Sequence, residues 1–295
     1  MICHPTATAV LMFAALMSIS PAGGALSSAA PPTSAAAAAA TIEQSRAARP
    51  VYTPPTETHL ATIPEATYNA VVPQLIDAAP FSNNAVPTLS YTLARVLVPV
   101  YGADRSAGPV ATMPQLSFTG QPTVVVPVAT APGGWSEVLT PSRNAEPSQS
   151  GGHAASQTAG WVRSGDLVLA AALPQHIRVN VSTHTLEIVE TTSGKVDQTF
   201  PVGTGKTGTD SPLGLTYLEA RFTDARQAAG QPINLTAAHS AIDDHPYGSD
   251  EGLIALHYEP NHAAAGISHG CVRLSQSGSD AVSQLPVGTP ILITE

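Results

Sequence analysis

The sequence predicts a mainly β protein in which a small barrel precedes a larger β-rich domain. Between residues 89 and 173, short β-like runs are separated by Gly and Pro turns, a pattern typical of small barrels. From Ile177 onward, apolar and polar residues alternate in runs joined by turns, which predicts an antiparallel meander that ends near Val202. Stretches rich in Lys and Glu, which favour helices, are scarce.

The first 25 residues are predicted to be a secretory signal. The run Ala7–Ile19 is apolar but too short to span a bilayer, and small residues suited to signal peptidase follow it, with cleavage after Ala25 or Ala30. The segment Met1–Thr6 lacks the usual Lys or Arg, so a wrongly assigned start and an uncleaved anchor remain alternatives. A secretory signal predicts a secreted or cell-wall-associated protein that meets a membrane only if the signal stays uncleaved.

Residues 26–88 read as a linker, because they combine an alanine run with repeated prolines and carry no apolar stripe. The predicted barrel covers residues 89–173. Its β-like runs are Arg95–Tyr101, Leu116–Phe118, Thr123–Val128, Trp135–Leu139 and Gly160–Val162. The polar stretch Pro141–Ala159 is expected to form a loop.

Composition excludes some classes of function. The formal net charge is −9, only 11% of residues are charged, and Lys195 and Lys206 are the two lysines. Nucleic-acid binding relies on clustered Lys and Arg, so it is not expected. The Gly203–Thr207 run resembles the end of a phosphate-binding loop, but the full pattern requires a glycine where this chain has Phe200. We therefore reject a nucleotide site.

The two cysteines, Cys3 and Cys271, have different expected fates. Cys3 lies in the predicted signal and would be lost with it, leaving Cys271 without an intramolecular partner. Exported proteins usually pair their cysteines, so an unpaired thiol is an accident, an intermolecular bridge or a reactive group. If the signal is retained, a Cys3–Cys271 disulfide is the alternative.

The segment Ser268–Leu274 carries the strongest chemical signal. Cys271 follows a histidine and a glycine, and His257 lies upstream in the apolar run Leu253–His257. A thiol beside imidazoles, with a glycine that frees the backbone, has the parts of a cysteine acyl-transfer site. The thiolate is the nucleophile, and a neighbouring imidazole favours it over the thiol.

Two resemblances to known families follow from these residues. The Thr204–Lys206 loop, the Ser-Pro-x-Gly run at 211–214, a histidine in an apolar strand and Ser268–Leu274 together resemble the L,D-transpeptidase (YkuD-like) catalytic domain, over about His176 to Glu295. The Trp-x-x-Val run at Trp135 and the Gly160–Asp166 run resemble bacterial SH3-like modules of cell-wall proteins. The barrel is then a wall-binding or peptide-binding module, or a folded spacer packed on the catalytic domain.

The first resemblance implies a β-rich catalytic sandwich with a short helix over residues 175–295, and no cofactor. It implies that Cys271 attacks peptidoglycan stem peptides before the terminal D-alanine and transfers the acyl group to an amine of a neighbouring stem, giving a 3→3 cross-link. Water as acceptor would make the protein an L,D-carboxypeptidase. Carbapenem-type inhibitors are expected to acylate the same cysteine.

The resemblance also implies roles for the neighbouring residues. His257 matches the family's base, and Tyr258 matches the position whose backbone carbonyl steadies the imidazole. The amides of Gly270 and Cys271 could form an oxyanion hole, and His269 could stabilise the intermediate or shape the pocket. Three residues are assigned to substrate binding: Arg273 as a carboxylate fork or a loop brace, Ser268 as a hydrogen-bond anchor, and Tyr247 as a lid residue or an ordinary loop aromatic.

Two features depart from the family's pattern. Ten residues separate His257 from Ser268, a shorter spacer than usual, and Tyr258 replaces a small residue. Both concern the loop Glu259–Ile267 and bear on the choice of acceptor more than on catalysis.

Two other classes of function remain as rivals. One is a metal site built from the histidines near Cys271, disfavoured because neither Cys-x-x-Cys nor His-x-x-x-His spacing is present. The other is a non-catalytic cell-wall-binding protein, which the intact Cys271, His257 and Gly270 argue against.

Overall fold

The computed structural model divides into two units, Met1–Thr53 and Pro54–Glu295, and paired strands make up most of the regular secondary structure described in the second. The structure describes residues 52–68, 70–78, 86–151, 154–225, 227, 230–240, 253–263 and 266–295. The predicted signal and the first half of the predicted linker lie outside these residues. No described helix is long and apolar enough to cross a membrane.

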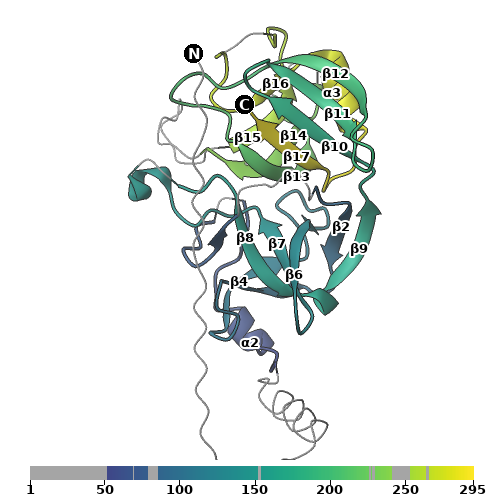
Figure 1. Ribbon diagram of the computed structural model, residues 1–295. Helices are drawn as coiled ribbons and strands as arrows, with labels where there is room; N and C mark the ends of the chain where they lie inside the picture. The colour runs from purple at the N-terminus through teal and green to yellow at the C-terminus, as the bar shows by residue number, and fades with distance from the viewer. Residues whose placement is uncertain are drawn as a thin grey trace, which may run out of the picture. The chain divides into compact units, whose positions relative to one another are not determined.

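The described residues before the catalytic domain form two sheets around one core. The larger sheet has the order β4-β3-β8-β7-β6, with β1 paired to β8, and the smaller has the order β5-β2-β9. Figure 1 labels β4, β6, β7 and β8 of the larger sheet and β2 and β9 of the smaller one. The strands are β1 (Ile76–Asp77), β2 (Leu89–Leu93), β3 (Leu97–Tyr101), β4 (Pro109–Pro114), β5 (Val124–Val125), β6 (Pro127–Ala131), β7 (Trp135–Thr140), β8 (Thr158–Arg163) and β9 (Leu167–Ala172). Short helical turns are α2 (Glu57–Leu60), η1 (Pro147–Ser150) and η2 (Ser164–Asp166).

The β-rich character of this part is confirmed, and its likeness to an SH3 module stays a prediction. Val98 and Val100, at alternate positions of β3, point into the core with Met113, Val138 and Val162, and all are fully buried. This is the period-2 pattern expected of strands with one buried face. Pairing among the described strands leaves two sheets rather than one closed barrel.

The linker prediction is wrong over residues 54–68 and 70–78. These residues join the folded unit, with Leu60, Ala66, Tyr68, Val72 and Leu75 buried. Their backbone bonds β4 through Ala66 N–H to the Thr112 carbonyl (2.6 Å), and it bonds the segment after β7 through Val72 N–H to the Arg143 carbonyl (2.8 Å). Their prolines do not prevent this, because proline is tolerated in extended chain at the edge of a sheet.

The C-terminal half begins with the predicted meander, which is confirmed. The strands β10 (Gln175–Asn180), β11 (Thr185–Glu190) and β12 (Val196–Gly203) pair antiparallel. The remaining elements are β13 (Gly214–Phe222), β14 (Ile233–His239), β15 (Leu253–Tyr258), β16 (Val272–Leu274), α3 (Gln276–Ser283) and β17 (Pro290–Thr294). Pairing closes in the order β10-β11-β12-β16-β15-β14-β13-β17.

The closed arrangement is built from two sheets that share β12 and β13. One sheet carries β10, β11 and β17, and the other carries β14, β15 and β16. Between them lies an apolar core that includes Ile177, Leu186 and Leu256. Helix α3 adds Val282 to this core, and the Ser275 hydroxyl caps its start by accepting from Gly278 N–H (3.1 Å). A mainly β architecture with a short helix is therefore confirmed.

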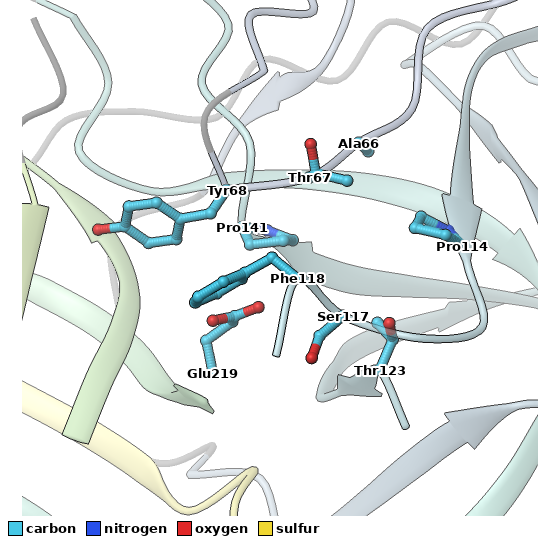
Figure 2. A pocket seen from close by; sticks show the side chains of 9 residues that line it. All are labelled: Ala66, Thr67, Tyr68, Pro114, Ser117, Phe118, Thr123, Pro141 and Glu219. Atoms are coloured by element: carbon cyan, nitrogen blue, oxygen red, sulfur yellow. The ribbon is translucent and has the colours of Figure 1, made fainter. Parts of the chain in front are cut away.

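A small cavity marks the place where the upstream segment meets β13. Figure 2 shows the carboxylate of Glu219 beside the ring of Phe118 in this cavity, which has room for about one water molecule. Glu219 is only 6% exposed, and no described group hydrogen-bonds its Oε2. Burial raises the pKa of this carboxyl group to about 7.

The Glu219 pKa predicts that stability falls as the solution becomes alkaline. The folded state holds this proton up to about pH 7, whereas the unfolded chain releases it near 4.5. The Glu219 contribution is therefore fully present below pH 4.5 and lost as pH rises through 7. The loss amounts to about 3 kcal/mol. Urea unfolding across this range should show the decline in the wild type and a flatter profile in Glu219→Gln.

The exposed carboxylate Glu190 on β11 provides the matched control. Glu190→Gln should keep the wild-type dependence of unfolding free energy on pH. Parallel profiles for the wild type and Glu219→Gln would contradict the assignment.

Candidate active site

The parallel pair β15–β16 brings the predicted nucleophile and base together. Its register sets Leu256 opposite Val272 and His257 opposite Arg273, so His257 lies beside the start of β16, where Cys271 precedes Val272. Leu256 and Val272 point into the core. Because side chains alternate across a strand, Ala255 and His257 project from the opposite face, and Ala255 belongs to the cluster that Cys271 contacts.

The Cys271 thiol is a half-buried group with polar neighbours. It is a free cysteine, it hydrogen-bonds the His257 ring, and its Sγ–H can donate to the Leu253 carbonyl at 3.5 Å. Burial by itself raises the thiol pKa. The hydrogen bond and charge of His257 lower it by more, with help from the Ala255 backbone and Arg273, so the net pKa of Cys271 is below its ordinary value.

His257 is oriented by the carbonyl of Tyr258, as predicted. Its Nδ1 lies 3.1 Å from this oxygen, and because a carbonyl can only accept, Nδ1 carries the proton. This leaves Nε2 as the ring nitrogen for the thiol. Burial lowers the pKa of His257, but the hydrogen bond and charge of Cys271 and the Tyr258 carbonyl outweigh burial, and the net pKa is raised.

Gln227 is a site residue that the sequence analysis missed. Its Nε2 donates to the Tyr258 carbonyl at 2.5 Å, so the oxygen that orients His257 is itself held in place. Nothing in the local sequence signals this contact, since 31 positions separate the two residues.

The turn before Cys271 depends on Gly270. Its φ is +108°, a conformation that favours glycine, and an added Cβ would come within 2.6 Å of Ile254 Cδ1. Ser268 is buried, and its hydroxyl donates to the Cys271 carbonyl at 2.5 Å and accepts from Gly270 N–H at 3.3 Å. Ser268 therefore braces the loop from within, and a substrate oxygen would have to replace the long Gly270 bond. His269 is half-buried.

The two supporting motifs hold this turn from outside. Lys206 N–H donates to the Ser268 carbonyl at 3.0 Å. The Ser211 hydroxyl donates to the Gly270 carbonyl at 2.8 Å and accepts from Gly205 N–H at 3.0 Å. The Thr204–Lys206 loop and the Ser211 run thus form a scaffold for the cysteine loop.

Arg273 extends from β16 on the side of His257. Its Nε is buried, and no described group hydrogen-bonds it. Its charge contributes to the lowered pKa of Cys271. The predicted carboxylate fork and the predicted loop brace both stay predictions.

Of the remaining predicted residues, Tyr247 lies outside the described residues. His239 is buried and its Nε2 donates to the Tyr68 carbonyl at 2.8 Å, which makes it part of the packing. Within the described part of the chain, no group of three His, Cys, Asp or Glu side chains is placed to hold a metal ion.

Comparison with known families identifies this domain. Residues 174–293 match the L,D-transpeptidase catalytic domain family, YkuD. This region is therefore an L,D-transpeptidase catalytic domain, as the sequence motifs predicted. The search of curated proteins found no match.

Several solved structures are similar to this chain. The NMR structure of the catalytic domain from E. faecium L,D-transpeptidase is 21% identical, with a TM-score of 0.30, covering 42% of this chain and 99% of that one. The same domain acylated by ertapenem has a TM-score of 0.29 at the same identity and coverage. An L,D-transpeptidase from Mycobacterium smegmatis is 16% identical, with a TM-score of 0.32, covering 55% of this chain and 91% of that one. The family match, and not these likenesses, carries the assignment.

The coupling of Cys271 and His257 predicts how the thiol titrates. Because His257 is the main group that lowers the Cys271 pKa, His257→Ala should raise it towards the ordinary value of about 8.5. The rate of alkylation by iodoacetamide, followed against pH, measures this midpoint. An unchanged midpoint in His257→Ala would refute the coupling. His262→Ala, in the loop after β15, is the control and should leave the midpoint in place.

Proposed function

We propose that this protein is an exported peptidoglycan L,D-transpeptidase whose nucleophile is Cys271. The observation that carries the proposal is the hydrogen-bonded pair of Cys271 and His257, in which the thiol pKa is lowered and the imidazole pKa is raised. Opposite shifts favour a thiolate beside an imidazolium near neutral pH. Such a pair supplies both a nucleophile and a proton for the leaving group.

In the first step, the Cys271 thiolate attacks the carbonyl carbon between the third stem residue and the terminal D-alanine. The carbonyl becomes a tetrahedral oxyanion, which the Cys271 amide can stabilise together with the Gly270 amide if that amide leaves Ser268. The C–N bond then breaks, and His257 gives its proton to the departing D-alanine amine. A thioester between Cys271 and the stem peptide remains.

In the second step, an amine of a neighbouring stem attacks the thioester. His257, now neutral, accepts a proton from this amine, and the thiolate leaves as the new amide forms. The product is a 3→3 cross-link, and the His257–Cys271 pair is restored. Arg273 is the candidate group for holding a stem carboxylate, because its buried Nε is unused by the described residues.

Export is a separate part of the proposal. It rests on the apolar run Ala7–Ile19 and the small residues that follow it. Sequencing the N-terminus of protein recovered outside the cell should place the first residue after Ala25 or Ala30. Recovery of a chain that starts at Met1 would refute cleavage.

The nucleophile is tested by intact mass after incubation with a carbapenem. Attack by the thiolate opens the β-lactam ring, so the protein should gain the whole mass of one carbapenem, and Cys271→Ala should gain none. A folded wild-type protein with a free thiol and no adduct would favour the non-catalytic wall-binding alternative.

The reaction class is tested with purified stem tetrapeptides. A cross-linked dimer that lacks one D-alanine is the expected product with the wild type. A trimmed tripeptide without dimer would show that water is the acceptor and would identify an L,D-carboxypeptidase.

A further inference from the structure

The regular backbone pairing between β14 and β15 is interrupted at Ile254, beside the candidate active site. The register runs from Leu235–Ala255 directly to His239–Leu253, so the residues between Leu235 and His239 face the single residue Ile254. Such a bulge removes regular partners from the backbone groups around it. Because buried backbone N–H and C=O groups need partners, other groups must satisfy them here.

The hydroxyl group of Tyr68 occupies this opening. It donates to the Ala238 carbonyl at 2.9 Å and accepts from Ile254 N–H at 3.3 Å, so it bridges the two strands where their own ladder fails. Thr236 completes the repair, because its hydroxyl donates to the Ile254 carbonyl at 2.8 Å. Burial chiefly raises the pKa of Tyr68, so the hydroxyl keeps its proton and remains a donor.

Tyr68 comes from outside the matched catalytic domain, which begins at residue 174. It is 4% exposed, and its ring stacks on His239 with centroids 4.1 Å apart. His239 fixes the upstream segment in turn, since its Nε2 donates to the Tyr68 carbonyl and its backbone N–H donates to the Ser156 carbonyl, both at 2.8 Å. His239 therefore holds both the ring and the backbone of Tyr68, which fixes the position of the Tyr68 hydroxyl group.

The segment that Tyr68 fixes is the one that contacts the thiol. The Leu253 carbonyl lies 3.5 Å from Cys271 Sγ, and the Ala255 backbone helps to lower the thiol pKa. Ile254, between them, presses its Cδ1 against the glycine turn before the cysteine. A shift of β15 at Ile254 would move all three contacts together.

We propose that Tyr68 is a positioning residue, supplied by the segment upstream of the catalytic domain, whose hydroxyl group sets β15 so that the backbone at Leu253–Ala255 holds Cys271 against His257. This rests on the proposed role of Cys271 as nucleophile. It adds a requirement that the family motifs do not contain, namely that residues 54–78 complete the site.

The experiment uses Tyr68→Phe in the whole chain. This change keeps the ring and its stacking on His239 and removes only the bridging hydroxyl. The rate of carbapenem acylation near neutral pH should fall roughly 5- to 10-fold. The pH midpoint of iodoacetamide alkylation should rise, which a tyrosine that only fills space would not cause.

Tyr217→Phe is the matched control. Tyr217 is fully buried on β13, and no described group hydrogen-bonds its hydroxyl. Its removal should leave both the acylation rate and the alkylation midpoint unchanged. Wild-type behaviour of folded Tyr68→Phe in both assays would overturn the positioning role.

Two further measurements separate a failure of the proposed function from a failure of the Tyr68 proposal. If the wild type itself forms no carbapenem adduct, the proposed function fails, while the alkylation midpoints still report on Tyr68. If Tyr68→Phe does not fold, Thr236→Val removes the other hydroxyl group that bonds the backbone at the bulge and should raise the midpoint in the same direction. An unchanged midpoint in folded Thr236→Val would show that the bulge does not set the thiol.

Discussion

The hydrogen bond between Cys271 and His257 depends on the parallel pairing of β15 with β16. In this closed set of strands, β15 pairs antiparallel with β14 and parallel with β16. The parallel pair returns the chain to the same end of the sheet, so the turn before Cys271 meets the strand that carries His257. The core-facing Leu256 and Val272 fix this register by burial, since a slip of one residue would expose both.

The pKa values of the buried thiol–imidazole pair show how strongly Cys271 and His257 interact. For both Cys271 and His257, burial alone favours the neutral form. Each charged form is favoured because the partner's hydrogen bond and charge, together with neighbouring groups, outweigh burial, which a solvent-exposed pair would achieve only weakly. Backbone groups around the pair contribute as well, with Ala255 beside the thiol and Tyr258 beside the imidazole. The lowered pKa of the Cys271 thiol therefore depends on the strands that surround it.

Alternation of apolar and polar residues predicted the meander. The resemblance carried by the local motifs predicted that Cys271, His257 and the Tyr258 carbonyl would lie together, and the structure brings them together. The carbonyl role was predictable although Tyr258 is an unusual residue there, since backbone oxygen does not depend on the side chain. Tyr68 and Gln227 were not predictable in this way. Tyr68 is 186 positions from Ile254 in the sequence. The prolines and alanines around Tyr68 predicted a linker. No sequence pattern predicted the bulge between β14 and β15, where the Tyr68 hydroxyl bonds the backbone.

The contacts of Tyr68 with β14 and β15 explain why the stretch predicted to be a linker is part of the folded unit. A second contact joins the two parts of this unit. The catalytic half presents Tyr217 and Ala237 to Val126, Leu139 and Ala159 of the upstream sheets, in one apolar cluster. Without that cover, the apolar surface and the backbone groups at Ala238 and Ile254 would face water, with the bulge beside the cysteine loop free to rearrange. The matched family domain thus holds Cys271 and His257, while Tyr68, which lies outside it, bonds the strands beside them.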